Sequence, residues 1–109
     1  MKGRRAKAMK TLLVTYKGNA SDRFDRDYYV NKHLPLAREI GGPLGMLSIE
    51  AFFPSGNTSG IVASCMIVLR DKEAEHALFS SPRFEELVKD LPNFSSLTPE
   101  QSFVPHLTD

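Results

Sequence analysis

Apolar and polar positions alternate near the start of the chain. Leu12, Val14 and Tyr16 lie two residues apart, and this period of two predicts a β-strand over residues 11–16. The next segment, residues 17–23, is polar and contains a glycine, which is typical of a loop. The sequence therefore opens with a strand and a loop.

Three further strands follow later in the chain. One is predicted over residues 46–53, and the Ser- and Gly-rich segment 54–60 after it is a strong turn signal. Residues 61–69 form a nearly unbroken apolar run, which is typical of a central strand covered on both faces. The last strand is predicted over residues 99–105, where Pro105 suits an edge position because proline cannot donate a ladder hydrogen bond.

A helix is predicted between the first two strands. Asp25 stands where the N-cap should be, and the Gly-Gly-Pro at 41–43 ends the helix. Pro35 falls inside it and removes a backbone hydrogen bond, so we expect a bend near His33 or two short segments. The positions spaced as one helix face are Tyr29, His33, Leu36 and Ile40.

A second helical region is predicted between the last two strands. Asp71 is expected to cap a helix that runs to about Phe79, with acidic residues in its first turn that suit the helix dipole. Ser81-Pro82 predicts that helix resumes with proline at its first position, where the missing N–H costs nothing. Residues 90–94 predict a turn. The apolar stripe of this helix is Phe84, Leu87 and Val88.

The predicted order β-α-β-β-α-β is that of a ferredoxin-like α+β fold with a four-stranded antiparallel sheet. Its two helical regions cover one face of the sheet and leave the other uncovered. Because residues 61–69 send apolar side chains to both faces, the uncovered face should be apolar, which is unusual for a monomer. We therefore expect a twofold homodimer in which two sheets face each other as an α/β barrel.

Length and charge agree with one small domain. The chain has 109 residues, of which 41% are hydrophobic, an ordinary value for a globular protein and too high for a disordered one. Five basic residues and no acidic ones occur in the first ten, whereas residues 11–109 sum to a formal charge of −4. We expect a flexible basic tail over residues 1–9 and a single domain over residues 10–109.

The composition also bears on location and partners. The apolar run after the basic tail is too short for a secretory signal or a membrane span, so we expect a cytoplasmic protein with no membrane partner. The acidic domain argues against nucleic acid as a partner. The one cysteine, Cys65, excludes an internal disulfide and lies in an apolar run, which favours a buried structural thiol.

The histidines do not form a metal motif. His33, His76 and His106 are far apart in sequence, and we expect no metal site and exposed side chains for the last two. Cys65 stands alone as a thiol, so no thiolate-rich site is expected either.

The densest cluster of reactive side chains lies on the first helix, between residues 23 and 36. Tyr29 and His33 are four apart and share a helix face, where an imidazole and a phenol can bind a carbonyl or enolate oxygen or move a proton. Tyr28 is the alternative to Tyr29. The competing interpretation is that both tyrosines pack on the sheet while His33 satisfies backbone groups near Pro35. Asp25 is interpreted as a cap rather than a base.

The turn after the last helix offers a second candidate. Asn93 could provide a polar contact at the rim of a pocket, or the segment could be only a helix stop with Phe94 as a hydrophobic peg. The remaining phenylalanines are expected in the core rather than in an aromatic substrate site; they are Phe52, Phe53, Phe79, Phe84 and Phe103.

Two separated motifs resemble those of the EthD family. The first helix carries Arg23-Phe-Asp-x-x-Tyr-Tyr-x-x-x-His-x-Pro-Leu36, and the later turn carries Asp90-x-Pro-Asn-Phe94. The opening strand ends in Val14-Thr-Tyr-Lys17, which also fits. The resemblance covers about residues 10–105 and leaves out the tail before Met9.

The resemblance implies a dimeric α/β barrel with a pocket between the first helix and the sheet. The family is named for ethyl tert-butyl ether degradation, where a member accompanies a cytochrome P450 system, and it is broadly classed with oxidoreductases. His33 would line the pocket with Tyr28 or Tyr29 beside it. Residues taken as candidates for substrate binding are Asp25, Leu36, Asn93 and Phe94.

The leading hypothesis is a small enzyme that acts on a hydrophobic oxygenated molecule without a tightly held cofactor. His33 would act as general acid/base or orient a substrate oxygen, in an oxygenation, isomerisation or decarboxylation. One alternative is a haem-binding barrel with His33 as axial ligand. Another is a non-catalytic small-molecule binder, or an accessory protein of an oxygenase.

Overall fold

The computed structural model describes residues 9–19, 21–54 and 60–104. The predicted tail up to residue 8, most of the predicted turn at 54–60, and Pro105 and His106 lie outside the described residues.

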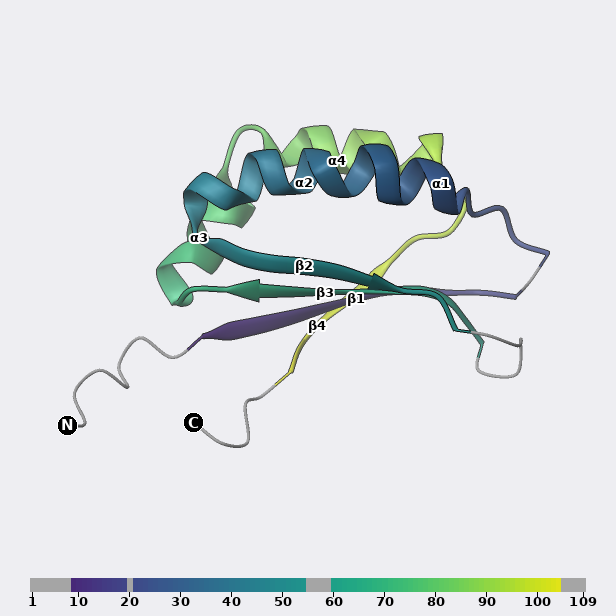
Figure 1. Ribbon diagram of the computed structural model, residues 1–109, viewed down its shortest axis with the longest axis horizontal. Coiled ribbons are helices and arrows are strands. Elements are labelled where there is room, and N and C mark those ends of the chain that lie inside the picture. Colours follow the sequence, from purple (N-terminus) through teal and green to yellow (C-terminus); the bar gives the residue numbers. More distant parts are fainter. Residues whose placement is uncertain (1–8, 20, 55–59, 105–109) are drawn as a thin grey trace.

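Four strands form one antiparallel sheet with a layer of helices above it (Figure 1). The strands are β1 (Lys10–Lys17), β2 (Met46–Phe52), β3 (Ile61–Leu69) and β4 (Glu100–Val104), in the spatial order β2-β3-β1-β4. The first helix consists of α1 (Arg26–Tyr28), η2 (Tyr29–His33) and α2 (Leu34–Gly41), and the second helical region contains α3 (Lys72–Ser80) and α4 (Phe84–Asp90). Short 3₁₀ turns follow at η3 (Gly42–Leu44) and η4 (Leu91–Asn93). The predicted ferredoxin-like α+β fold is confirmed, with β3 central and β4 at an edge.

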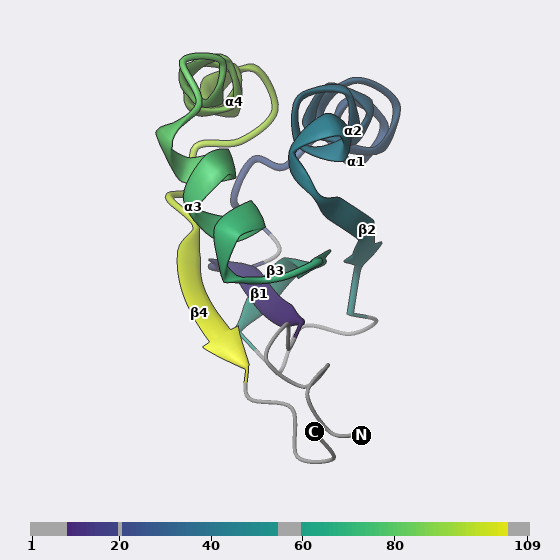
Figure 2. The same ribbon diagram turned by 90° about the vertical axis from the view of Figure 1, so that its left-hand side faces the viewer.

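The helices all lie on one face of the sheet, with α2 and α4 side by side (Figure 2). The alternation in β1 and β3 produces this layering, because every second side chain of each strand turns toward the helices. Leu12 and Tyr16 on β1 and Cys65 and Leu69 on β3 are at most 2% exposed. These side chains form the floor of the core.

The first helix is continuous from Arg26 to Gly41, and its irregularity is a π-helical turn. The Asp25 side chain accepts a hydrogen bond from the Tyr28 N–H, which confirms the predicted cap. The Leu34 N–H bonds to the Tyr29 carbonyl five residues back, just before Pro35. The helix therefore accommodates Pro35, which has no N–H to donate, by widening into the π-helical turn η2. The sequence predicts a bend or two separate segments here, and the structure has a continuous helix instead.

The second helical region contains two helices, as predicted, but the second begins later. Asp71 caps α3 by accepting from the Ala74 N–H at 2.8 Å. Ser81, Pro82 and Arg83 form a turn in which the Phe84 N–H bonds to the Ser81 carbonyl. The expectation that Pro82 is the first helical residue is wrong, because this turn reorients the chain so that α4 can run beside α2.

The uncovered face of the sheet mixes apolar and small polar side chains. Register pairs Leu13 with Met66 and Thr15 with Ser64 on this face, and all four are half-buried in the single chain. Two of the five phenylalanines expected in the core are exposed, whereas Phe53, Phe79 and Phe84 are half-buried against it. Phe52 and Phe103 are each 47% exposed because both lie on edge strands.

Candidate functional site

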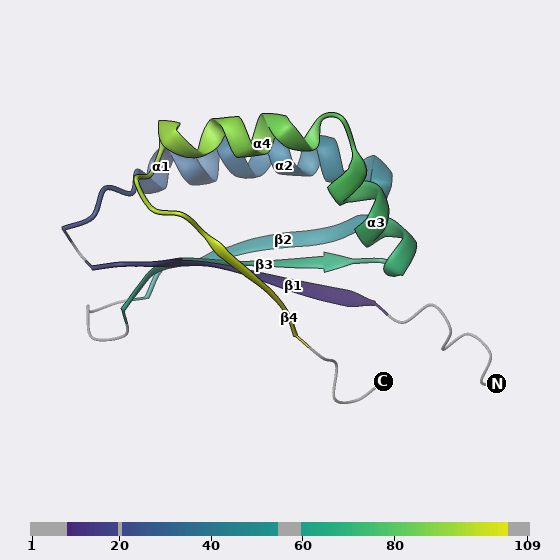
Figure 3. The same cartoon turned by 180° about the vertical axis from the view of Figure 1, so that it is seen from behind.

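A cavity of about 90 Å³ lies between the sheet, α2 and α4. Most of its lining is aliphatic or aromatic, and α4 contributes Phe84, Leu87 and Val88. Two lining residues are exposed, Val88 on α4 and Gln101 on β4, so the cavity opens on the side where α4 passes above β4 (Figure 3). The predicted pocket between the first helix and the sheet therefore has a wall from the second helical region as well.

His33 is the histidine that lines this cavity. It is the last residue of η2, and only 8% of it is exposed. Its ring stacks on Tyr29, with centroids 5.5 Å apart and planes 17° apart, and packs against Phe94 at 4.7 Å. The π-helical turn and these rings hold the imidazole in one orientation between α2 and α4.

Asp90, the last residue of α4, binds the ring of His33. Its Oδ2 lies 2.8 Å from His33 Nδ1. Its Oδ1 accepts from the Tyr28 hydroxyl at 2.6 Å and from the Asn93 side-chain amide at 3.0 Å. Partial burial works to raise the pKa of Asp90, but the hydrogen bonds from Tyr28, Asn93 and His33 together hold it below its ordinary value. Asp90 is therefore a carboxylate at neutral pH.

The charge of Asp90 decides which nitrogen of His33 carries hydrogen. An ionised carboxylate can only accept, so Nδ1–H donates to Asp90 and Nε2 holds the lone pair of the neutral ring. Within the described residues Nε2 has no hydrogen-bond partner. Nε2 is accordingly the nitrogen left to meet a ligand in the cavity.

Burial sets the protonation state of His33. Loss of water lowers the pKa of His33 below its ordinary 6.5, and this outweighs the opposing effect of the Asp90 carboxylate. The imidazole is therefore neutral at pH 7. A neutral imidazole with a fixed tautomer can accept a proton, and the Asp90 carboxylate can stabilise the imidazolium that results.

A second polar group lines the cavity from the sheet side. The side chains of Tyr29, Tyr16 and Cys65 meet there, and the two hydroxyls and the thiol are close enough to shift one another's pKa. Both tyrosines are 1% exposed, and burial raises the pKa of each well above its ordinary value. Burial also raises the pKa of Cys65, to about 11, so the thiol is protonated at neutral pH. The prediction of a buried Cys65 is confirmed.

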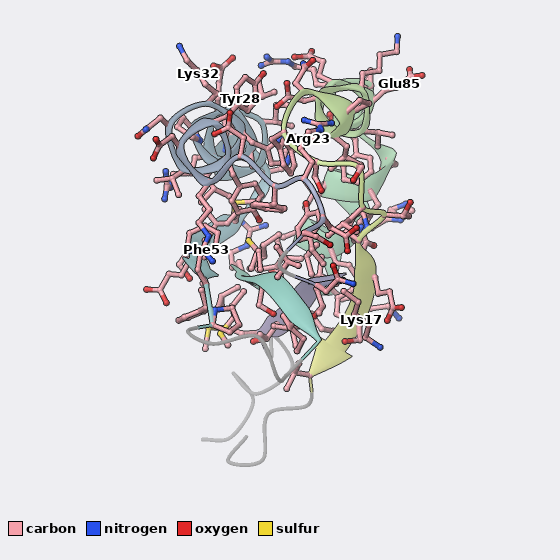
Figure 4. The ribbon with its side chains drawn as sticks, turned by 90° about the vertical axis from the view of Figure 1, so that its right-hand side faces the viewer. Lys17, Arg23, Tyr28, Lys32, Phe53 and Glu85 are labelled. Atoms are coloured by element: carbon pink, nitrogen blue, oxygen red, sulfur yellow. The ribbon has the colours of Figure 1, made fainter. Side chains whose placement is uncertain are left out.

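The predicted catalytic residues fall on two sides of His33. Tyr29 lines the cavity, whereas Tyr28 lies outside the lining and contacts Asp90 at the end where α1 begins (Figure 4). Arg23 reaches the same end and donates to the Pro92 carbonyl at 2.6 Å. Tyr29, and not Tyr28, therefore lines the cavity, and Tyr28 binds Asp90 instead.

The four candidates for substrate binding lie outside the cavity lining. Asp25 is exposed and caps α1, and Leu36 is half-buried on the first helix. Asn93 is exposed and binds Asp90 and, at 3.4 Å, the Tyr28 hydroxyl. Phe94 is fully buried, as the peg interpretation required. Asn93 and Phe94 support the site through Asp90 and His33 instead of lining it.

Sequence reasoning missed Asp90 and Tyr16 as members of the site. Asp90 is the first residue of the second motif, but its partner His33 is 57 positions away and periodicity cannot connect them. Tyr16 was assigned to a strand, and the alternation in β1 does place it on the same face as Cys65 of β3. The alternation of side chains within these two strands, which pair in the sheet, was the only sequence signal for that cluster.

His76 is exposed, as predicted. Across residues 9–19, 21–54 and 60–104, no three His, Cys, Asp or Glu side chains are grouped to hold a metal ion. No helix in the described part of the chain is long and apolar enough to cross a membrane.

Solved structures with the same fold include two of the EthD type. An EthD-like protein from Ralstonia eutropha is 20% identical, with a TM-score of 0.73, and the match covers 88% of this chain and 89% of that one. An ethyl tert-butyl ether degradation family protein from Bacillus halodurans is 21% identical, with a TM-score of 0.64 and coverage of 86% and 96%.

The fold is also similar to that of SnoaB, a cofactor-independent oxygenase from Streptomyces nogalater. That match has 10% identity and a TM-score of 0.68, and covers 90% of this chain and 92% of that one. Comparison with curated proteins found no significant match. At these identities the structures establish the fold alone and leave the reaction to the site.

The sequence profile of the EthD domain matches residues 17–98, which include the first helix, the central strand and the turn that begins at Asp90. That match spans most of the chain and contains both motifs that build the pair of His33 and Asp90. This protein belongs to the EthD family.

Proposed function

We propose that this protein is a small enzyme that removes a proton from a hydrophobic, oxygenated small molecule, with His33 Nε2 as the general base and no tightly bound cofactor. The observation that carries the proposal is the 2.8 Å contact between His33 Nδ1 and the Asp90 carboxylate beside an apolar cavity. This contact leaves Nε2 unprotonated and available. Oxygenation and isomerisation can each begin from the anion that such a base produces.

The surroundings of His33 suit this role. Its pKa is lowered by burial, so the imidazole remains a base at and below neutral pH. The cavity supplies apolar contacts for a carbon skeleton, but its volume is below the roughly 300 Å³ of ordinary ligand pockets. The substrate is therefore compact, or it extends through the opening between Val88 and Gln101. A cofactor-independent oxygenase such as SnoaB has a similar fold, which is compatible with cofactor-free chemistry here.

The test is deuterium exchange into cyclohex-2-enone, a compact carbon acid, in D₂O at neutral pD, followed by proton NMR. We expect the wild-type protein to accelerate the loss of the acidic C–H signals, and His33→Gln to lower that acceleration by about 10²- to 10⁴-fold. The matched control is His76→Gln, because His76 is exposed on α3 outside the cavity. Equal rates for wild type and His33→Gln would overturn the proposal.

A second measurement distinguishes the haem-binding alternative from the proposed proton removal. Titration of the purified protein with haemin should give no shift of the Soret band that depends on His33. A shift that His33→Gln abolishes would favour the haem-binding alternative.

We also propose that two copies pair through the uncovered sheet face. Half-buried Leu13 and Met66 lie at its centre, and Phe52 and Val104 lie exposed toward its edges. Burial of these side chains by a second copy would close the barrel. Light scattering at micromolar concentration should give the mass of a dimer for wild type and of a monomer for Met66→Glu. A monomeric wild type would contradict the pairing.

A further inference from the structure

The sheet side of the cavity carries hydroxyl groups that general-base catalysis by His33 does not use. Tyr16 on β1 and Tyr29 on η2 both line the cavity, and so does Cys65 on β3. Their side chains are 1%, 1% and 2% exposed, so bulk water does not solvate them. Buried hydroxyl groups without a visible task at the wall of a cavity call for a physical explanation.

The hydrogen count of this group leaves a donor free. Two hydroxyls and one thiol hold three hydrogens between them. Tyr29 is the middle member and lies beside both Tyr16 and Cys65, so contacts within the group use at most two of these hydrogens. At least one of the three hydrogens is therefore not used within the group. It is available to an acceptor in the cavity.

We infer that Tyr16, supported by Tyr29 and Cys65, donates a hydrogen bond to the oxygen on which the substrate's negative charge develops. This inference rests on the proposed function, and it names the substrate class: enolisable carbonyl compounds and phenols, whose conjugate bases carry their charge on oxygen. His33 lines the same cavity as these three side chains. The Tyr29 ring stacks on His33, and the Tyr29 hydroxyl lies beside Tyr16.

The proton and electron balance of the step is complete without a co-reactant. The C–H or O–H bond of the substrate breaks, its proton passes to His33 Nε2, and its electron pair moves to the oxygen that faces Tyr16. Asp90 stabilises the resulting imidazolium through Nδ1. Return of the proton to a different carbon would give an isomer. The tyrosines remain protonated throughout, because burial holds their pKa values high.

A phenolate probe separates the donor from the base. We use 4-nitrophenol at a pH where the free probe is already ionised, so that binding requires no proton transfer, and follow its visible absorbance. Tyr16→Phe should weaken phenolate binding by about 10- to 100-fold, the effect of one hydrogen bond to a charged group. Binding of 4-nitrotoluene, which has a methyl group in place of the oxygen, should change little.

The control variant is Thr15→Val. It removes a hydroxyl from the adjacent residue of β1, whose side chain lies on the opposite face of the sheet. Phenolate affinity should equal that of wild type. Tyr29→Phe interrupts the chain at its middle member and should also weaken phenolate binding. If circular dichroism and thermal unfolding show that Tyr16→Phe does not fold, Tyr29→Phe alone tests the proposal.

The outcomes distinguish the two proposals. Unchanged phenolate affinity in the folded tyrosine variants, or no phenolate binding to wild type, overturns the donor role. If His33→Gln exchanges deuterium as fast as wild type while Tyr16→Phe still loses phenolate affinity, the base assignment fails and the donor site remains. Loss of exchange in His33→Gln together with loss of phenolate affinity in Tyr16→Phe supports both.

Discussion

The two helices that enclose the cavity are held in place by different interactions. The first, from Arg26 to Gly41, buries the side chains of Tyr29, His33, Leu34 and Ile40 against the sheet. None of the residues of α4 is fully buried. Polar contacts at its two ends connect α4 to the first helix: Arg83 with Glu39 at 2.8 Å, and Asp90 with His33.

This difference assigns separate tasks to the two helices. The base stands on the helix that hydrophobic burial fixes, whereas the carboxylate that orients it stands on the helix that burial fixes least. Because Phe84, Leu87 and Val88 of α4 also line the cavity, a ligand that displaces this helix would alter the contact between Asp90 and His33. The comparison predicts that substitutions in the first helix, other than those of His33 itself, act mainly on stability and those at the Asp90 end of α4 mainly on chemistry.

The largest effect is expected from Asp90→Asn. An amide at this position can donate to Nδ1, which moves the hydrogen of the neutral imidazole to Nε2 and removes the lone pair from the cavity. Deuterium exchange into cyclohex-2-enone should fall by about 10²- to 10⁴-fold, close to the loss in His33→Gln. NMR of the ring nitrogens should show the other tautomer. Wild-type exchange in a folded Asp90→Asn would contradict the role of α4.

The next largest effect concerns stability. Ile40 on α2 is 4% exposed and lies outside the cavity lining, so Ile40→Ala should lower the free energy of unfolding by about 2–5 kcal/mol. Val88 on α4 is 48% exposed, and Val88→Ala should cost less than about 1 kcal/mol. Urea unfolding of both variants measures the contrast. Similar losses would show that α4 is packed as firmly as the first helix.

The burial of His33 between the two helices should also make stability depend on pH. The pKa of His33 is lower in the folded protein than the ordinary 6.5, so between these two values the unfolded chain binds more protons. Stability should therefore decrease as the pH falls below about 6.5 and through the pKa of folded His33. Denaturant unfolding at several pH values should show a smaller decrease for His33→Gln. An unchanged pH profile would indicate that His33 is not shielded from water.

The smallest effect is expected at the other end of α4. Arg83→Ala removes the ion pair with Glu39 and a second contact with Glu86 at 2.9 Å, all between exposed side chains. Surface ion pairs of this kind contribute little to stability, so urea unfolding should change only slightly. The effect should shrink further at high salt. A large loss would mean that this end, and not Asp90, positions α4.

Features of the structure that depend on near neighbours were predictable from sequence. Asp25 and Asp71 cap their helices as expected, because a cap bonds to a backbone N–H three residues away. The start of α4 was predicted two residues early, since the Ser81 turn competes with the preference of Pro82 for a first helical position. The bend expected near His33 is a π-helical turn, because packing of Tyr29 and His33 keeps the helix continuous.

The sequence by itself determined the alternation of the strands, the helix caps, the position of His33 on the first helix and the membership of the chain in its family. Only the tertiary structure decided that Asp90 orients His33, that Tyr29 and not Tyr28 lines the cavity, and that Tyr16 and Cys65 join it there. The physical reason is the separation along the chain between the residues that interact. Hydrogen bonds of caps and turns connect residues a few positions apart, whereas the cavity exists only after β1, β3, the first helix and α4 have packed together.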